Sequence, residues 1–364
     1  MDIIMKRHLI SKALLALLFM GSASLWAQTS DPFGDVDINK YANTMNITGY
    51  VRMVTLVNGQ WSAVNDEVLG KEAVVAVYCG NELRGKDSPR DYLDGEYKNL
   101  LMLTVHGDTK GQPLHFKVYT KGRVIEVDQG VTFTIDARIG QVAEPFYINL
   151  PSPVTTTFST EEWATTCLPF DAEVPNGVTL YTATDITPSL GTGMPGELVM
   201  EKIEATVLPA NTPVLLQGND ITSCEWLARI IDSETLTQQS SLLQGGNGGG
   251  TSILKGTIEP TDITHNDVLT LGHSNETGAI GFWLYTGSVI PANRAYIADF
   301  PSGTNGARIA PTQGISTAVQ YVATESQQTE QVYDLQGRRV EEFGIRNSEL
   351  KKGVYIVNGK KRIY

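Results

Sequence analysis

Histidine and acidic side chains are the first candidates for chemistry in this chain, and none of them stands in a recognised catalytic or metal-binding pattern. Beyond residue 27 the histidines are His106, His115, His265 and His273. None of them lies in an HExxH motif or four residues from another histidine, the spacing at which two helical histidines bind zinc. His106 and Asp108, in the sequence His-Gly-Asp, could orient a base as a histidine–carboxylate pair does. A strand that ends in a Gly-Asp turn explains the same residues more simply.

Serine and aspartate motifs also fall short of a site. There is no GxSxG nucleophile elbow, and the SxxK match at Ser348 and Lys351 lies in a polar linker, not in the dry pocket that a Ser–Lys nucleophile requires. The stretch Asp35-Val-Asp37-Ile-Asn39 resembles the opening of a calcium loop, but Asn46 stands where such a loop needs its bidentate acid. We therefore predict no enzyme activity, no cofactor and no metal. A hydrolase whose residues assemble only in space is the alternative.

The three cysteines do not have the number or spacing of a disulfide scaffold or a zinc site. Cys79, Cys167 and Cys224 are odd in number and show no CxxC spacing, which argues against a disulfide scaffold and against zinc. Cys79 and Cys167 lie in apolar surroundings and are expected to be small buried residues. One disulfide between two of the three is compatible with the sequence, which does not choose the pair.

Tryptophans are candidates for a binding surface. Trp61, Trp163, Trp226 and Trp283, together with many tyrosines, could form a platform on which sugar rings stack. Aromatic side chains of β-modules are more often core residues. Whether a platform exists therefore depends on which of the four rings are exposed.

Short β-strands must position these residues over the first half of the chain. Leu114, Phe116 and Val118 alternate with polar residues and are expected to face a core. About seven or eight such strands, separated by turns such as Asn58-Gly59, predict a β-sandwich over residues 44–150. A polar linker at 28–43 precedes it.

A second β-module is predicted over residues 155–315. Pro209-Ala210-Asn211 recurs as Pro291-Ala292-Asn293, each time before an apolar strand. Because proline fixes φ and asparagine tolerates the left-handed region, the two copies suggest equivalent strand starts in a duplicated sheet. A helix capped by Ser233 is expected at 233–243. The glycine-rich stretch 244–251 is interpreted as a hairpin-tip insertion, with a ligand-adapting loop as the alternative.

The end of the chain predicts a small β-hairpin domain at 330–364, after a linker at 316–329. Asn358-Gly359 suits a type I′ turn, which needs positive φ at both central positions. This turn pairs Val357 with Lys360 and Val354 with Ile363, and the pair can add an upstream strand at 331–335. Such a small unit is marginally stable by itself.

The beginning of the chain has the pattern of a signal peptide. Lys6, Arg7 and Lys12 precede an apolar run and then small residues, and cleavage is expected between Ala27 and Gln28. The apolar run is too short for a comfortable transmembrane helix, and we expect no transmembrane segment after its removal. The net charge of −12 makes nucleic acid or an anionic lipid surface an unsuitable partner. The length suggests two or three domains of about 100–200 residues.

Three regions of the chain match patterns of a known class of proteins. Residues 332–340 (VYDLQGRRV) and 352–357 (KGVYIV) resemble the C-terminal sorting domains of Bacteroidetes secretory proteins. Residues 75–85 (VAVYCGNELRG) and 103–108 resemble an N-terminal sandwich module of the same class, and the repeated Pro-Ala-Asn region recurs in surface proteins of that group. The resemblance implies export by the type IX secretion route, or descent from it with the tail kept as a β-cap. The matching tail residues are Tyr333, Asp334, Gly337, Arg338, Gly353, Tyr355, Asn358 and Gly359.

Taken together, the sequence predicts an all-β, secreted or cell-surface, non-catalytic protein that acts by binding or adhesion. Its expected partners are an extracellular ligand, either glycan or protein, and the secretion machinery. Besides the dispersed hydrolase, a second alternative is a structural component of a surface layer or fimbria that exchanges edge strands. The periplasm is the alternative location.

Overall fold

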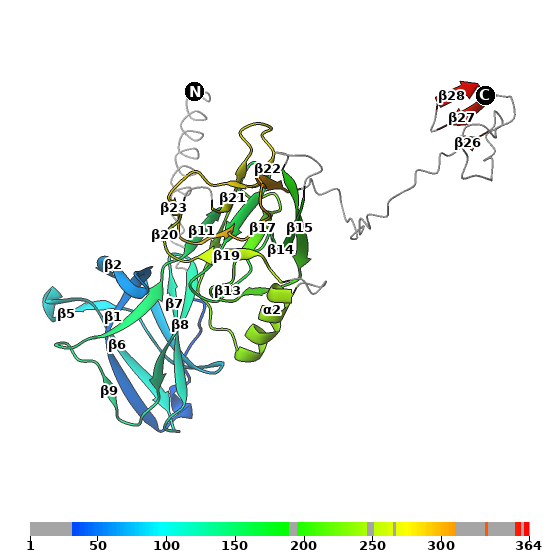
Figure 1. Ribbon diagram of the computed structural model, residues 1–364. Helices are drawn as coiled ribbons and strands as arrows, with labels where there is room; N and C mark the ends of the chain where they lie inside the picture. The colour runs from blue at the N-terminus through cyan, green and yellow to red at the C-terminus, as the bar shows by residue number, and fades with distance from the viewer. Residues whose placement is uncertain are drawn as a thin grey trace, which may run out of the picture. The chain divides into compact units, whose positions relative to one another are not determined.

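The protein is described here from a computed structural model, which describes residues 31–188, 195–245, 251–264, 267–309, 332–333, 354–357 and 360–363. The fold is all-β, as the sequence predicted, with one α-helix among the described residues (Figure 1). The chain divides into two compact units, residues 1–310 and 311–364.

Two facing sheets form a sandwich at the start of the larger unit. The first has the order β10-β1-β6-β5, with β2 and β9 also paired to β1, and the second has the order β4-β3-β7-β8. Two short 3-10 turns, η1 (Ile38–Lys40) and η2 (Leu93–Gly95), accompany them. The strands are β1 (Asn43–Val57), β2 (Gln60–Val68), β3 (Val74–Cys79), β4 (Glu82–Asp87), β5 (Arg90–Tyr92), β6 (Tyr97–Gly107), β7 (Pro113–Thr120), β8 (Arg123–Thr132), β9 (Arg138–Ile139) and β10 (Phe146–Pro151).

Strand β7 shows why these residues fold this way. Leu114, Phe116 and Val118 are fully or almost fully buried, while the polar residues between them are only partly buried, so the expected alternation is confirmed. Gly49 explains the parallel pairing of β1 with β10. A Cβ at this position would lie 1.8 Å from the carbonyl oxygen of Phe146, so only glycine allows the two backbones to approach.

The second part of the larger unit is built on a nine-stranded sheet of order β12-β17-β14-β15-β25-β22-β21-β24-β19. The sheet curves until β12 and β24 meet, where the backbone N–H of Ala295 donates to Thr165 Oγ1 at 3.2 Å. Three two-stranded ladders, β11–β18, β13–β16 and β20–β23, surround it. The strands are β11 (Val154–Thr157), β12 (Trp163–Thr166), β13 (Ala172–Glu173), β14 (Val178–Thr187), β15 (Gly196–Ile203), β16 (Val207–Leu208), β17 (Val214–Gly218), β18 (Ser223–Trp226), β19 (Leu254–Thr257), β20 (Thr261–Asp262), β21 (Leu269–His273), β22 (Ile280–Leu284), β23 (Val289–Ile290), β24 (Arg294–Ile297) and β25 (Gly306–Arg308).

The two Pro-Ala-Asn copies occupy the same place in two similar antiparallel ladders. Asn211 and Asn293 both have positive φ, 59° and 57°. The first copy joins β16 to β17, which pair with β13 and β12; the second joins β23 to β24, which pair with β20 and β19. Each ladder is thus a long antiparallel pair interrupted once by the same turn, with two further strands of the chain between its arms.

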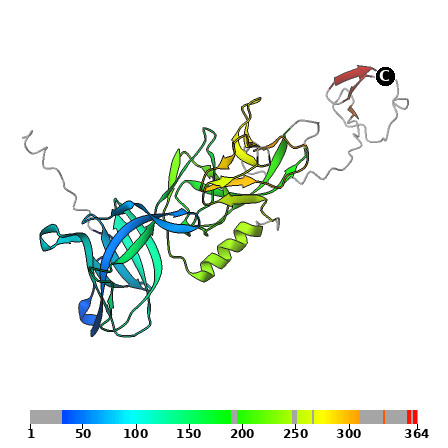
Figure 2. The ribbon, with the colours of Figure 1, turned by 60° about the vertical axis from the view of Figure 1, so that its left-hand side comes forward.

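Helix α2 (Ser233–Gly245) agrees with the expected position, but its cap differs from the expectation. Asp232, not Ser233, accepts the backbone N–H of Thr235 at 2.8 Å and is the N-cap. The sequence offered two neighbouring capping residues, and the carboxylate of Asp232 also accepts the Thr235 hydroxyl at 2.7 Å. Figure 2 shows α2 as a separate rod beside the sheets.

One hydrophobic core runs through both parts of the larger unit. It includes Phe116 and Ile125 of the sandwich as well as Leu168, Leu216 and Trp226 of the second part. A second core lies within the curved sheet and includes the buried side chains of Trp163, Ala183, Leu215, Phe282 and Ile297.

Backbone hydrogen bonds cross the junction between the two parts. The N–H of Glu126 donates to the carbonyl oxygen of Ala228 at 3.0 Å, and the N–H of Ile230 donates to Glu126 Oε2 at 3.2 Å. Strand β8, the edge of the second sandwich sheet, is therefore covered by residues 228–230.

The smaller unit contains β26 (Val332–Tyr333), β27 (Val354–Val357) and β28 (Lys360–Ile363) in one antiparallel sheet. Val357 pairs with Lys360 and Val354 with Ile363, so the expected hairpin register is confirmed. Tyr333 lies in β26 and Tyr355 in β27. The other predicted residues lie outside the part of the chain that the structure describes. They are Asp334, Gly337, Arg338, Gly353, Asn358, Gly359 and the expected cleavage residues Ala27 and Gln28. Among the helices that are described, none is long and apolar enough to cross a membrane.

Candidate functional site

The contacts around His115, and those of Asp108 beside His106, serve to hold the fold together. Asp108 Oδ1 accepts the backbone N–H of Ala42 at 2.8 Å and the Asn43 amide at 3.3 Å, so it fixes the start of β1. His115 stacks on Tyr78 with ring centroids 5.9 Å apart, and burial, followed by the nearby Lys117 charge, lowers its pKa. His265 lies outside the described residues.

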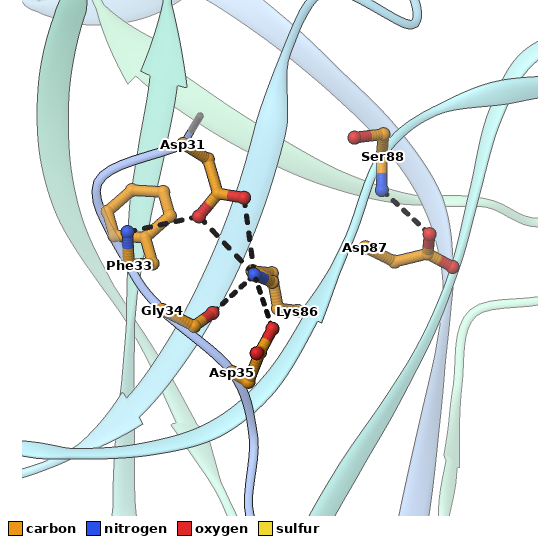
Figure 3. Close-up of polar contacts among 7 residues, drawn as sticks. All are labelled: Asp31, Phe33, Gly34, Asp35, Lys86, Asp87 and Ser88. Atoms are coloured by element: carbon orange, nitrogen blue, oxygen red, sulfur yellow. Dashed lines mark hydrogen bonds and ion pairs between the residues drawn. The ribbon is translucent and has the colours of Figure 1, made fainter. Parts of the chain in front are cut away.

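The acidic stretch that resembled a calcium loop is held by a lysine instead (Figure 3). Lys86 Nζ lies 3.2 Å from Asp31 Oδ2 and 3.6 Å from Asp35 Oδ1, and it also donates to the carbonyl oxygen of Gly34. Asp37 caps the turn η1 by accepting the N–H of Asn39 at 3.2 Å. Within the described part of the chain, no three His, Cys, Asp or Glu side chains gather in a way that could hold a metal ion.

All three cysteines are free thiols. Cys167 and Cys224 are buried, and desolvation raises the pKa of each to about 11. Cys79 packs against the core but is only partly buried, whereas the sequence predicted a small buried residue. It stands at the end of β3, where the strand leaves the sheet for a turn.

The four tryptophans differ in solvent exposure, and this difference shows which of them belong to the core and which could form a binding platform. Trp226 is fully buried and donates its indole N–H to Thr156 Oγ1 at 3.0 Å, and Trp163 is 4 % exposed. Trp283 is partly buried, with its N–H donated to the carbonyl oxygen of Gly272 at 3.1 Å. Trp61 is 43 % exposed. Only Trp61 among the four therefore presents much of its ring to solvent.

Turn chemistry positions the Trp61 ring. Asn58 and Gly59 have φ of 53° and 73°, and this turn pairs Val57 with Gln60 and Leu56 with Trp61. The N–H of Gly59 donates to Glu259 Oε2 at 2.9 Å, which ties the tip of the hairpin to the second part of the unit. The ring is thus carried on a short, anchored hairpin.

Trp61 lines a cleft of about 550 Å³, here called the Trp61 cleft, between the sandwich and the second part of the same unit. One wall comes from β2, β8 and β10, and the other from the segments around Phe170, Ala210 and Arg229. Its polar lining residues are Glu126, Asp128, Gln129, Asn149, Asp171 and Arg229.

The sandwich wall of the cleft is stiffened by side-chain hydrogen bonds. Gln129 donates to the carbonyl oxygen of Tyr147 at 3.1 Å and accepts the N–H of Asn149 at 3.3 Å, joining β8 to β10. Arg52 Nε donates to Asn149 Oδ1 at 2.7 Å while its guanidinium lies 4.2 Å from the centroid of the Tyr147 ring.

The opposite wall is fixed in the same way. Asp171 Oδ1 accepts the N–H of Ala210 at 2.7 Å, so the first Pro-Ala-Asn turn is part of the cleft. Arg229 donates to the carbonyl oxygen of Val124 and reaches Glu173 Oε2 at 3.5 Å. Both carboxylate oxygens of Glu126 accept hydrogen bonds, one from Lys117 Nζ at 2.8 Å and one from the N–H of Ile230.

The Trp61 cleft can bind a ligand, because an apolar indole ring and fixed polar groups line the same cleft. Sequence reasoning named Trp61 among four tryptophans but missed Asn149, Asp171 and Arg229, which come from distant parts of the chain. The turn Asn58-Gly59 directly before Trp61 was the available signal, because it places the ring at a hairpin tip.

Comparison of the chain with protein-family models, with curated proteins and with solved structures finds no match. The resemblance to secretory proteins therefore stays an expectation.

Proposed function

We propose that this protein is an exported, non-catalytic binding protein of the cell surface or medium, and that it binds glycan in the Trp61 cleft. The observation that carries the proposal is Trp61 itself, 43 % exposed on an anchored hairpin beside fixed polar groups.

A glycan fits this combination of surfaces. A sugar ring has an apolar face that can cover an indole, and hydroxyls at its edge that need hydrogen-bonding partners. Asp128 is exposed and Asn149 partly exposed at the same cleft, so polar groups line it together with the indole. The cleft volume of about 550 Å³ lies within the range of small-molecule sites.

Binding is favoured over hydrolysis by the way the cleft carboxylates are used. All three carboxylates that line the cleft, Glu126, Asp128 and Asp171, accept a backbone N–H, from Ile230, Gly130 and Ala210 respectively, and so maintain the walls. A glycosidase needs two carboxyl groups free to exchange protons with substrate and water. Carboxylates committed to the backbone supply rigidity, which suits a binding site.

Glycan binding is tested by replacing the ring. Covering the exposed part of the indole, roughly 100 Å², contributes about 2 kcal/mol. We expect Trp61→Ala to weaken binding to immobilised glycans at least about tenfold. Leu93→Ala is the matched control, because Leu93 is 70 % exposed on the same sandwich and does not line the cleft. If the wild-type protein retains no polysaccharide or glycan on an array, the proposal is wrong.

Export is tested separately by fractionating native cells that express the full chain or a chain truncated after Thr329. We expect the full chain at the surface or in the medium and the truncated chain in the periplasm. Equal localisation of the two would leave the tail as a structural cap and return periplasmic roles to consideration.

A further inference from the structure

A second pocket opens at the place where the curved sheet brings β12 and β24 together. Its volume is about 400 Å³, and it is here called the Arg294 pocket. The residues that matter most for its chemistry are Trp163, His273, Ile280, Tyr285, Ile290 and Arg294.

Arg294 is the unusual residue of this pocket. It is partly buried, and its guanidinium makes no hydrogen bond, ion pair or ring contact with any residue that the structure describes. The other arginines that are at least partly buried there, Arg52, Arg84 and Arg229, all have partners for their guanidinium groups. Partial burial of a cation without a partner costs free energy, which a bound anion would offset.

The backbone that carries Arg294 is held firmly. Asn293 has a positive φ of 57° at the second Pro-Ala-Asn turn. The Thr257 hydroxyl donates to the carbonyl oxygen of Pro291 at 2.7 Å, and the N–H of Arg294 donates to Thr257 Oγ1 at 3.3 Å. The direction in which the arginine leaves the strand is therefore set before any ligand arrives.

The walls around Arg294 are mainly apolar, although the hydroxyl residues Thr157, Ser159, Thr165 and Thr270 also line the pocket. The lining residues Trp163, Ile280, Ile290 and Ala295 are all at least nine-tenths buried and are here called its apolar floor. The hydroxyl of Tyr285 is already donated to the carbonyl oxygen of Val289 at 2.8 Å, so this residue offers the pocket its ring.

No acidic side chain is among the described residues that line the pocket. The lining residue His273 carries an acid outside the lining: its Nε2 lies 2.6 Å from Glu161 Oε2, and this hydrogen bond, followed by that from Thr160, lowers the pKa of Glu161.

The internal repeat shows that the arginine is not needed for the turn. The first Pro-Ala-Asn copy is followed by Thr212, whose hydroxyl lies 3.4 Å from the carbonyl oxygen of Ala210. The second copy is followed by Arg294 at the same place. The same turn thus forms when a short side chain follows it, so the turn does not require the long charged side chain of Arg294.

We propose that the Arg294 pocket binds a small ligand that carries a carboxylate on an apolar body. A guanidinium presents two parallel N–H groups that match the two oxygens of a carboxylate. The apolar floor would cover the body of the ligand. Phosphate and sulfate carry more negative charge than a carboxylate, and the lining offers one arginine to neutralise it. This site is independent of the Trp61 cleft.

The experiment uses phenylacetate and its neutral analogue phenylacetamide as probes, with calorimetry on the full chain. We expect phenylacetate to bind the wild type, and Arg294→Thr, the residue of the first repeat, to weaken binding at least about tenfold. Arg308→Gln is the control, because Arg308 is exposed and paired with Glu197 at 3.2 Å. Thermal unfolding of each variant establishes that it is folded.

Three outcomes would overturn the proposal. These are no binding of phenylacetate to the wild type, equal binding of phenylacetamide or inorganic phosphate, and undiminished binding to a folded Arg294→Thr variant. Trp61→Ala should bind phenylacetate as the wild type does, so failure of the glycan proposal and failure of this one are distinguishable.

Discussion

Desolvation controls the reactivity of individual cysteines. Burial raises the pKa of Cys167 and Cys224 to about 11. At pH 8 roughly one thousandth of such a thiol is the reactive thiolate. We expect iodoacetamide to label Cys79 first and the other two only in denaturant, as read by peptide mass spectrometry. Native labelling of Cys167 or Cys224 at the rate of Cys79 would contradict this.

The same two thiols make stability depend on alkaline pH. The fold favours the protonated form, so this stabilisation is complete below the unfolded thiol's pKa of about 8.5. It is lost as pH rises toward the folded value of about 11. Urea unfolding should therefore give a lower free energy at pH 10 than at pH 8. The Cys167→Ala/Cys224→Ala double variant should lose less between the two pH values, and an unchanged loss would assign the effect to other groups.

At the scale of elements, sequence patterns correctly predicted the features that depend on residues close together in the chain. The alternation in β7 and the register of the terminal hairpin followed from side-chain periodicity and an Asn-Gly turn. The cap of α2 was misplaced by one residue, because Asp232 and Ser233 are both capping types. The exposure of Trp61 against the burial of Trp226 was not predictable, because it depends on strands far apart in sequence.

The Pro-Ala-Asn turn is an element whose conformation can be tested directly. Asn211 has a φ of 59°, a region in which alanine is strained and glycine is not. We expect Asn211→Ala to destabilise the protein by about 1–2 kcal/mol and Asn211→Gly by clearly less. Thermal unfolding of the two variants measures the difference. Equal losses would mean that the asparagine side chain, and not its backbone, fixes the turn.

The segment before β1 is an element held by side-chain contacts. Near its start, Lys86 binds Asp31 and the carbonyl oxygen of Gly34 (Figure 3), and Phe33 packs edge-on against Tyr78 with centroids 6.3 Å apart. Near its end, Lys40 pairs with Glu82, and the Arg84 guanidinium lies over the Tyr41 ring. We expect Lys86→Met to release residues 31–41, seen as faster hydrogen exchange there with little change in global stability, because such ion pairs contribute little to folding. Lys202→Met, which removes the exposed pair with Glu204, is the control. Unchanged exchange at 31–41 would show that the contacts made by Phe33, Lys40 and Tyr41 suffice.

At the scale of the whole molecule, the two Pro-Ala-Asn turns contribute to two different surfaces. The first turn contributes Ala210 to the Trp61 cleft, and the second contributes Arg294 to the Arg294 pocket. A duplicated turn therefore supports one apolar–polar cleft and one cationic pocket. Because each turn belongs to its own antiparallel ladder, the two proposed sites are separable by mutation.

The larger unit should unfold as one body, because its core and its hydrogen bonds cross residues 151–154. Arg123 Nε lies 2.5 Å from Glu225 Oε2, and the N–H of Glu126 donates to Ala228 across the same junction. We expect residues 31–309 to show a single calorimetric transition. The fragment 31–152 should be less stable and should associate, because it exposes the edge of β8 and the apolar surface that the second part covers. Size-exclusion chromatography and calorimetry of both chains test this prediction. Two separate transitions in 31–309, or a monomeric and equally stable fragment 31–152, would show that the sandwich folds independently. The Trp61 cleft would then lie between two autonomous domains.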